Sequence, residues 1–429
     1  MDPVNLARLE FALTVVFHYL LVALTLGLVL LVAITQTRWA RTGQPVFERM
    51  TRFWGLAYVI NYAVGIGAGI AMEFQLGMNW SGLENAAASV VGAPLSVETV
   101  VAFFAESTFL ALWIFGRKYL STGWHLALIW LTTAAAYLSA VWALIANGFM
   151  HHPEGYQLQS GKVLVLNNIG ALLLNSNSWI AIGHIVPGAV LTGGFFMLGV
   201  SAVLKKRGNA DEEFIRRSMR TGAHAALWGV LGVIGMGMLQ LELVTKQQPV
   251  KFAAFINSQS TLAEFAKQLQ ARFGEVDMPP GVLVRYSALT MMGCAVVLLV
   301  FAIWAFVATR GGRLVDRRAL LVLLPIVLIF PYIANAAGWV FREVGRQPYV
   351  IYGILSTNEA LTPSLTAGAL TVSLIVFVAV VAVLLGLDWF LLGKLARRGP
   401  GHTIDLWAPN EDADDPDGPA ARDNTAVLV

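Results

Sequence analysis

The stretch GWVFREVGRQPY, residues Gly338–Tyr349, follows an apolar run of about 20 residues, which is long enough to cross a bilayer. It places Arg342, Glu343 and Arg346 close together where the chain leaves the membrane. A carboxylate here can ligate a metal or hold a proton, and the planar guanidinium of arginine binds carboxylates and phosphates in a bidentate way. The alternative interpretation is an interfacial cap of long side chains that reach water and pair locally.

The composition around this stretch is that of a membrane protein. Of the 429 residues, 57% are hydrophobic and 13% are charged, and the mean hydropathy is +0.66. These values indicate a polytopic helical membrane protein. The net charge of +3 is too small to indicate a nucleic acid partner. The single cysteine, Cys294, excludes an internal disulfide and a CxxC metal site.

Nine apolar runs are long enough to span a bilayer, so we predict an all-α polytopic membrane protein with about nine transmembrane helices. The runs are 10–35, 53–76, 95–116, 125–147, 177–204, 221–241, 284–309, 319–338 and 365–393. The first run has no basic region before it and no small-residue cleavage site after it, so we interpret it as the first span and not as a signal peptide.

Lys and Arg in the loops predict the orientation. The loops on one side carry 19 of them, and the longer loops on the other side carry nine. The positive-inside rule then places the N-terminus outside and the C-terminus in the cytoplasm. The longest loop, about 242–283, faces outward. We predict one transmembrane domain over residues 1–398 and an acidic, disordered cytoplasmic tail over 399–429.

Ionisable and metal-ligating side chains inside spans are candidate functional residues, because a membrane interior makes them costly. His18 and His184 lie deep among apolar residues, where a neutral imidazole either ligates a haem or is a satisfied structural residue. Met291 and Met292 lie in the seventh span, where methionine either packs or provides the second ligand of a low-spin haem.

Two carboxylates lie in the third span. Glu98 and Glu106 are eight residues apart, which separates them by about 12 Å along a helix and leaves them on one broad face. Buried carboxylates suit proton relay. Ser139 and Asn147 in the fourth span extend such a path by hydrogen bonds. The alternative is an end cap at Glu98 and a satisfied carboxylic acid at Glu106.

Five blocks of the sequence, in order, resemble one family. Besides GWxxxExGRQP with its following aromatic residue, they are FALTVVFHYLLVALTLG (Phe11–Gly27), GIAMEFQLGMNW (Gly69–Trp80), GAPLSVETVVAFFAESTF (Gly92–Phe109) and ANGFMHHP (Ala146–Pro153). Together these blocks resemble subunit I of cytochrome bd quinol oxidases, over most of residues 1–200 and 285–398.

The resemblance implies three haems. His184 and Met291 correspond to the ligands of the low-spin haem b558. His18 and Glu343 correspond to the protein ligands of the two high-spin haems, one each. These are haem b595 and either haem d or a third b-type haem. The family usually has an arginine where this chain has Leu289, and Arg285, one turn earlier, is the cation that we expect to replace it.

The resemblance also implies supporting residues. Those expected to hold haem propionates or to tune the haem potential are Arg8, Trp339, Arg346 and Arg285. The segment QPVKFAAFI, Gln248–Ile256, matches the quinol segment of the family at Lys251, but Ile256 replaces its acidic residue. Glu242 is the nearest carboxylate that could serve as the base, and the identity of the electron donor therefore stays open.

The resulting hypothesis is the haem-bearing subunit of an electrogenic quinol:oxygen oxidoreductase in a bacterial-type cytoplasmic membrane. Its implied partners are quinol, dioxygen, membrane lipid, a second membrane subunit and a small single-helix subunit. One alternative is a related haem oxidoreductase with another donor. Another is a proton-coupled transporter that uses Glu98 and Glu106. A haem–copper oxidase would need several histidines within spans, whereas we expect His151 and His152 on the surface of an outer loop.

Overall fold

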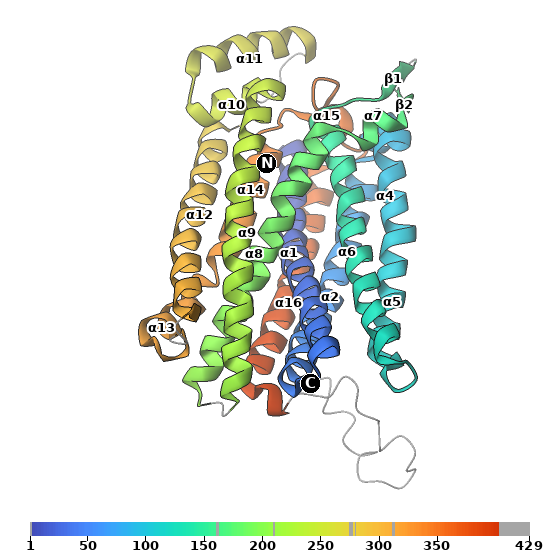
Figure 1. Ribbon diagram of the computed structural model, residues 1–429. Helices are drawn as coiled ribbons and strands as arrows, with labels where there is room; N and C mark the ends of the chain where they lie inside the picture. The colour runs from blue at the N-terminus through green and yellow to red at the C-terminus, as the bar shows by residue number, and fades with distance from the viewer. Residues whose placement is uncertain are drawn as a thin grey trace.

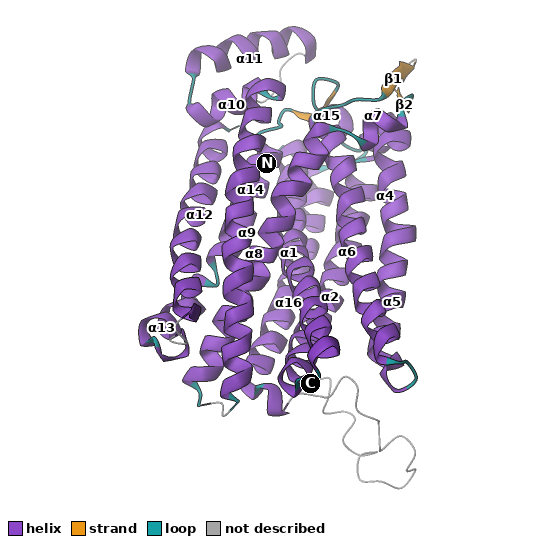
Figure 2. Cartoon of the chain, in the orientation of Figure 1, coloured by secondary structure: helices purple, strands orange, loops and turns teal. Residues whose placement is uncertain are grey.

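The computed structural model describes residues 2–159, 163–208, 211–273, 278, 280–310 and 314–402. Within these residues, nine helical segments are long and apolar enough to cross a membrane, as the sequence predicts. They stand side by side as one bundle (Figure 1). The described chain is almost entirely helical, with two short hairpins at one end (Figure 2).

The α-helices are α1 (Pro3–Thr42), α2 (Pro45–Asn79), α3 (Ser81–Ala87), α4 (Ala93–Val97), α5 (Phe104–Phe115), α6 (Thr122–His151), α7 (Ile169–Leu173), α8 (Ser176–Lys206), α9 (Glu212–Gln247), α10 (Pro249–Ile256), α11 (Gln259–Phe273), α12 (Gly281–Arg310), α13 (Arg318–Val327), α14 (Phe330–Val344), α15 (Thr357–Ala360) and α16 (Ala367–Arg398). The antiparallel hairpins pair β1 (Tyr156–Gln159) with β2 (Val163–Leu166), and β3 (Tyr349–Ile351) with β4 (Leu355–Ser356).

The third span is not one regular α-helix. Two π-helical segments, Ala88–Gly92 and Glu98–Phe103, interrupt it on either side of α4. Such wide turns rotate the residues that follow them and are frequent at functional sites. Glu98 is the first residue of the second π segment, so the angular relation expected for Glu98 and Glu106 on a straight α-helix does not apply.

Helix α1 is the centre of the bundle and packs against α2, α6, α8, α14 and α16. Its contact with α8 is close because two glycines meet. A Cβ atom added at Gly27 would lie 2.9 Å from the backbone nitrogen of Gly193. Small residues let membrane helices approach until their backbones touch, and van der Waals contact then holds them together.

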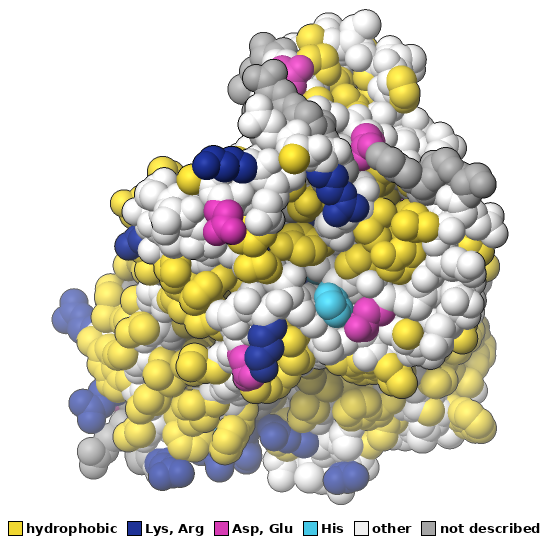
Figure 3. Space-filling model, turned by 90° about the horizontal axis from the view of Figure 1, so that it is seen from above, with side chains coloured by type: hydrophobic (Ala, Val, Ile, Leu, Met, Phe, Trp, Pro, Cys, Tyr) yellow, Lys and Arg dark blue, Asp and Glu magenta, His cyan; other side chains and the backbone are white. Residues whose placement is uncertain are grey.

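One end of the bundle carries the N-terminus, α10, α11 and both hairpins (Figure 1). We call it the outer end, following the predicted orientation. Seen from this end, charged side chains are scattered among hydrophobic ones and form no single basic patch (Figure 3). The predicted outer loop 242–283 contains the last turns of α9 together with α10 and α11. Of the predicted tail, residues 403–429 lie outside the described residues.

We expect Gly27→Ala to lower the melting temperature of the detergent-solubilised protein, because the added methyl group meets the α8 backbone and overpacking costs about 1–3 kcal/mol. Gly235→Ala is the matched control, because a Cβ there would meet nothing within 4 Å. Thermal unfolding followed by intrinsic fluorescence measures both variants. Equal melting temperatures for the two variants would contradict the close α1–α8 contact.

Candidate functional site

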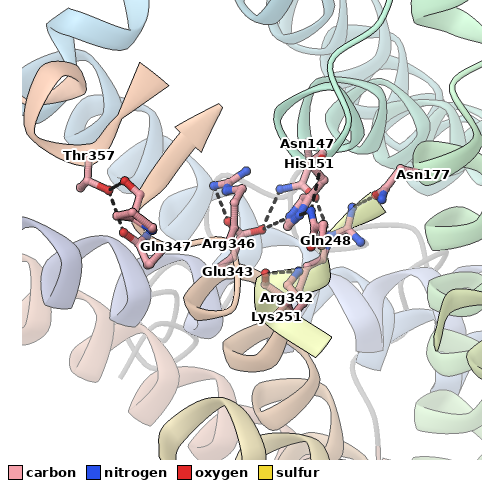
Figure 4. Close-up of polar contacts among 11 residues, drawn as sticks. Asn147, His151, Asn177, Gln248, Lys251, Arg342, Glu343, Arg346, Gln347 and Thr357 are labelled. Atoms are coloured by element: carbon pink, nitrogen blue, oxygen red, sulfur yellow. Dashed lines mark hydrogen bonds and ion pairs between the residues drawn. The ribbon is translucent and has the colours of Figure 1, made fainter. Parts of the chain in front are cut away.

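The charged residues of the GRQP stretch form a buried cluster at the outer end. The carboxylate of Glu343, near the end of α14, accepts hydrogen bonds from Asn147 Nδ2 at 2.9 Å, His151 Nε2 at 3.2 Å and a terminal guanidinium nitrogen of Arg346 at 2.5 Å (Figure 4). Arg346 is only 4% exposed. The cluster is therefore an internal network and not a cap of solvated side chains.

The expectation that His151 lies on the surface is wrong. Its side chain is fully buried, because α6 continues to this residue and turns it inward. Its Nδ1 accepts a hydrogen bond from Gln248 Nε2 at 2.8 Å, and Nε2 donates to Glu343. Spacing could have revealed this role, because Asn147 and His151 are four residues apart and share one helix face.

Two further cations lie beside this network. Arg342 donates from Nε to Asn147 Oδ1 at 2.7 Å and from a terminal nitrogen to Asn177 Oδ1 at 3.0 Å. The Nζ of Lys251, on α10, donates to the backbone carbonyl of Arg342 at 2.9 Å. Burial, and then the nearby charge of Arg342, hold the pKa of the Lys251 ammonium well below its ordinary value. The predicted quinol segment thus contacts the GRQP stretch directly.

A cavity of about 130 Å³ lies between α8, α9, α12 and α14, and we call it the His184 cavity. Both predicted ligands of the low-spin haem, His184 and Met291, line it, as do Lys251 and Arg342. The Nδ1 of His184 is 3.1 Å from the carbonyl oxygen of Val233. This contact makes Nδ1 the donor and leaves the Nε2 lone pair available for a metal.

Met291 reaches the same cavity because α14 has a glycine opposite it. A Cβ atom at Gly338 would lie 2.8 Å from the sulfur of Met291. Met292 also lines the cavity but is 41% exposed. A histidine with a free Nε2 and a thioether in one apolar cavity fit the ligand set of a low-spin haem iron. The role of Met291 remains a prediction.

A second cavity of about 600 Å³ lies between α1, α2, the third span and α6, and we call it the His18 cavity. His18 lines it, and the buried Nδ1 of this histidine has no hydrogen-bond partner among the described residues. A Cβ atom at Gly69 would lie 3.0 Å from the ring. The volume is that of a typical cofactor pocket, and one histidine fits a haem with a single protein ligand.

Three of the four predicted proton-path residues line the His18 cavity. They are Glu98, Glu106 and Ser139. The hydroxyl of Ser139 donates to Glu98, and the Tyr58 hydroxyl donates to Glu106 at 3.1 Å. Asn147 does not line this cavity. It lies instead in the Glu343 network.

Glu343 lines neither of these two cavities. Because three donors already bond to its carboxylate, Glu343 has no carboxylate oxygen free to ligate a haem iron in this arrangement. Three buried donors beside Glu343 make no hydrogen bond within the described residues: Nε and one terminal nitrogen of Arg346, and Nε1 of Trp339. These donors could bind an anionic group. The Trp339 ring stacks on Tyr19, with centroids 5.0 Å apart.

The remaining predicted residues lie apart from the two cavities. Arg8 donates to Asn5 at 3.2 Å. Glu242 forms an exposed ion pair with Lys246 at 2.7 Å, and neither Glu242 nor Arg285 lines the His184 cavity. The structure therefore brings Lys251, but not its predicted base, to the His184 cavity. Sequence spacing did not identify Asn177 and Gln248, which complete the wall of the cavity.

Comparison with known proteins agrees with this geometry. The family model for cytochrome bd terminal oxidase subunit I matches residues 6–271 and 257–400. The chain is 33% identical to cytochrome bd ubiquinol oxidase subunit 1 of Bacillus subtilis, over 94% of this chain and 95% of that protein. It is 30% identical to cytochrome bd-II ubiquinol oxidase subunit 1 of Escherichia coli, over 93% and 97%.

A solved structure of bd oxidase from Geobacillus thermodenitrificans has the same fold, with a TM-score of 0.81 and 24% identity, over 93% of this chain and 99% of that one. The relatives are covered over almost their whole length, and the matched residues include both cavities. The chain therefore belongs to the cytochrome bd terminal oxidase subunit I family.

Proposed function

We propose that this terminal oxidase subunit takes electrons from a quinol at its outer end and reduces dioxygen to water. His184 and Met291 would hold haem b558. His18 would hold one of the high-spin haems, which are haem b595 and either haem d or a third b-type haem. Glu343 is the predicted ligand of the other, and in that role it would exchange one of its three hydrogen-bond donors. The observation that carries the proposal is the free Nε2 of His184 in one cavity with Met291 and Lys251.

The chain's own residues prepare this site. When bound, the haems supply electron transfer and dioxygen reduction. The Val233 carbonyl orients the His184 ring. Lys251 lines this cavity, and its side chain would donate a hydrogen bond to a quinol oxygen. At the His18 cavity, Glu98 and Glu106 would hold protons on their way to the site of dioxygen reduction, with Ser139 and Tyr58 as hydrogen-bond partners.

The predicted topology decides on which side of the membrane protons are released and on which side they are taken up. Quinol protons would leave at the outer end, and the protons consumed in water formation would enter from the cytoplasm. This arrangement generates a proton-motive force without pumping. Bacterial relatives and the basic loops support a location in the bacterial cytoplasmic membrane. The relatives are named as subunit 1, which supports a second membrane subunit, and a small single-helix subunit fits the same assembly.

One observation favours a second candidate, a bd-type oxidase with another electron donor. Ile256 is half-exposed where an acidic residue is expected, and Glu242 is paired with Lys246 outside the cavity. Lys251 then lacks the predicted base. The transporter alternative is set aside because the family of the chain is that of terminal oxidases.

The reduced-minus-oxidised visible spectrum of the purified oxidase tests the haem assignment. We expect the wild-type oxidase to show a low-spin b-type band. His184→Ala should remove this band, because the histidine ring provides an iron ligand. Met292→Leu is the matched control for Met291→Leu and should leave the band in place. Met291→Leu should convert the band to a high-spin form. A full low-spin band in His184→Ala would reject the assignment, and the absence of haem from folded wild-type protein would reject the proposed function.

Oxygen uptake with a quinol as donor tests the proton path. We expect Glu98→Gln to reduce turnover by about 10²-fold, which is the lower range for loss of a proton-transfer group. Ser139→Ala should have a smaller effect, because it removes only a hydrogen bond to Glu98. Glu84→Gln, an exposed carboxylate of the same span, is the control. Normal turnover in Glu98→Gln would be the contrary result.

Steady-state kinetics test the role of Lys251. We expect Lys251→Gln to raise the KM for quinol by roughly 2- to 10-fold, with a smaller change in kcat, because a hydrogen bond is worth about 0.5–1.5 kcal/mol. Lys246→Gln, an exposed lysine of the same region, serves as the control. If KM is the same in Lys251→Gln and wild type, the donor binds elsewhere.

A further inference from the structure

The His184 cavity has a positively charged wall. Two cationic side chains, Arg342 and Lys251, line it, and no acidic side chain of the described residues does. Both cations are buried, with 7% and 2% of their surfaces exposed. An unpaired buried charge costs several kcal/mol, so such charges are normally paired or bound to a ligand. The chain itself provides no counter-ion within this wall.

The contacts of Arg342 do not neutralise it. None of the ion pairs formed by the described residues includes Arg342. Its two side-chain hydrogen bonds end on the neutral amide oxygens of Asn147 and Asn177. The second terminal nitrogen of the guanidinium makes no hydrogen bond within the described part of the chain. The nearby Glu343 carboxylate attracts Arg342 electrostatically, but the two side chains form no hydrogen bond or ion pair within the described residues. The two amides hold the guanidinium in place and leave it available to accept a further anionic partner.

The neighbouring cations are less suited to receive an anion in this cavity. Arg346 pairs with Glu343, and Lys251 donates to a backbone carbonyl and has a lowered pKa, so it loses its charge more readily than Arg342. Arg285 is on the same helix as Met291 but does not line the cavity. Leu289, two residues before Met291, is 44% exposed and points away from it.

We propose that Arg342 is the residue that receives an anionic group, a carboxylate of the bound haem, in the His184 cavity. The proposal rests on the proposed function, because it takes that cavity as the low-spin haem site. The planar guanidinium, held by Asn147 and Asn177, presents a fixed donor to a carboxylate. Its charge also stabilises the reduced iron, whose net charge is one unit less positive than that of the oxidised iron. Arg342 is thus a positioning and potential-setting residue contributed by α14.

Redox titration of the low-spin haem in the purified oxidase tests this inference. At an ambient potential equal to the wild-type midpoint, we expect Arg342→Gln to lower the ratio of reduced to oxidised haem by about tenfold, which corresponds to a loss of about 1.4 kcal/mol of electrostatic stabilisation of the reduced form. Arg342→Lys should retain most of the ratio. Arg310→Gln, at the opposite end of α12, is the control and should leave it unchanged.

The results that would overturn the assignment of Arg342 differ from the result that would reject the proposed function. An unchanged ratio in Arg342→Gln, or a lower ratio in Arg285→Gln alone, would overturn the assignment of Arg342. If Arg342→Gln does not retain haem, Arg342→Lys decides, because it keeps the positive charge: haem retained with most of the wild-type ratio supports the proposal, and loss of haem or a tenfold lower ratio overturns it. Absence of a low-spin haem from the wild-type oxidase would instead reject the proposed function.

Discussion

Glu343 lies at the outer end of α14 with its side chain 12% exposed, and its carboxylate accepts hydrogen bonds from Asn147, His151 and Arg346. A charge in this position is tolerated only when donors surround it, because desolvation in a protein interior is costly. The donors come from α6 and from the turn after α14, and His151 extends the contact to Gln248 at the start of α10. This requirement fixes the relative positions of three distant parts of the chain at the outer end of the His184 cavity.

Helix α1 separates the two cavities. The consecutive α1 residues His18 and Tyr19 line different cavities. His18 lines the His18 cavity, and Tyr19 lines the His184 cavity. The rest of the bundle packs around α1, and the glycine contact with α8 sets the distance between the helices that carry the two histidines. The fold therefore brings the predicted haem ligands together through ordinary helix packing.

The third span shows why residue spacing alone was insufficient. Its two carboxylates do share a cavity, but they do so through a π-helical segment that begins at Glu98. The sequence pattern around Glu98 contains no signal for that wider turn. Similarly, Asn147 was expected beside Ser139 on the proton path, whereas it bonds to Glu343 and Arg342. The second difference has another cause: α6 is a regular α-helix, and the eight residues from Ser139 to Asn147 carry Asn147 about 12 Å further along it, to the outer end where Glu343 lies.

Hydropathy and charge determined the nine spans, and the family motifs identified the candidate ligands, because those signals are local in sequence. Only the tertiary structure decided which side chains lie together. It buried His151, placed Glu242 outside the cavity and brought Lys251 to Arg342. The physical reason is that buried charges and polar groups select their partners across helices, from residues up to 363 positions apart, and no local pattern encodes that selection.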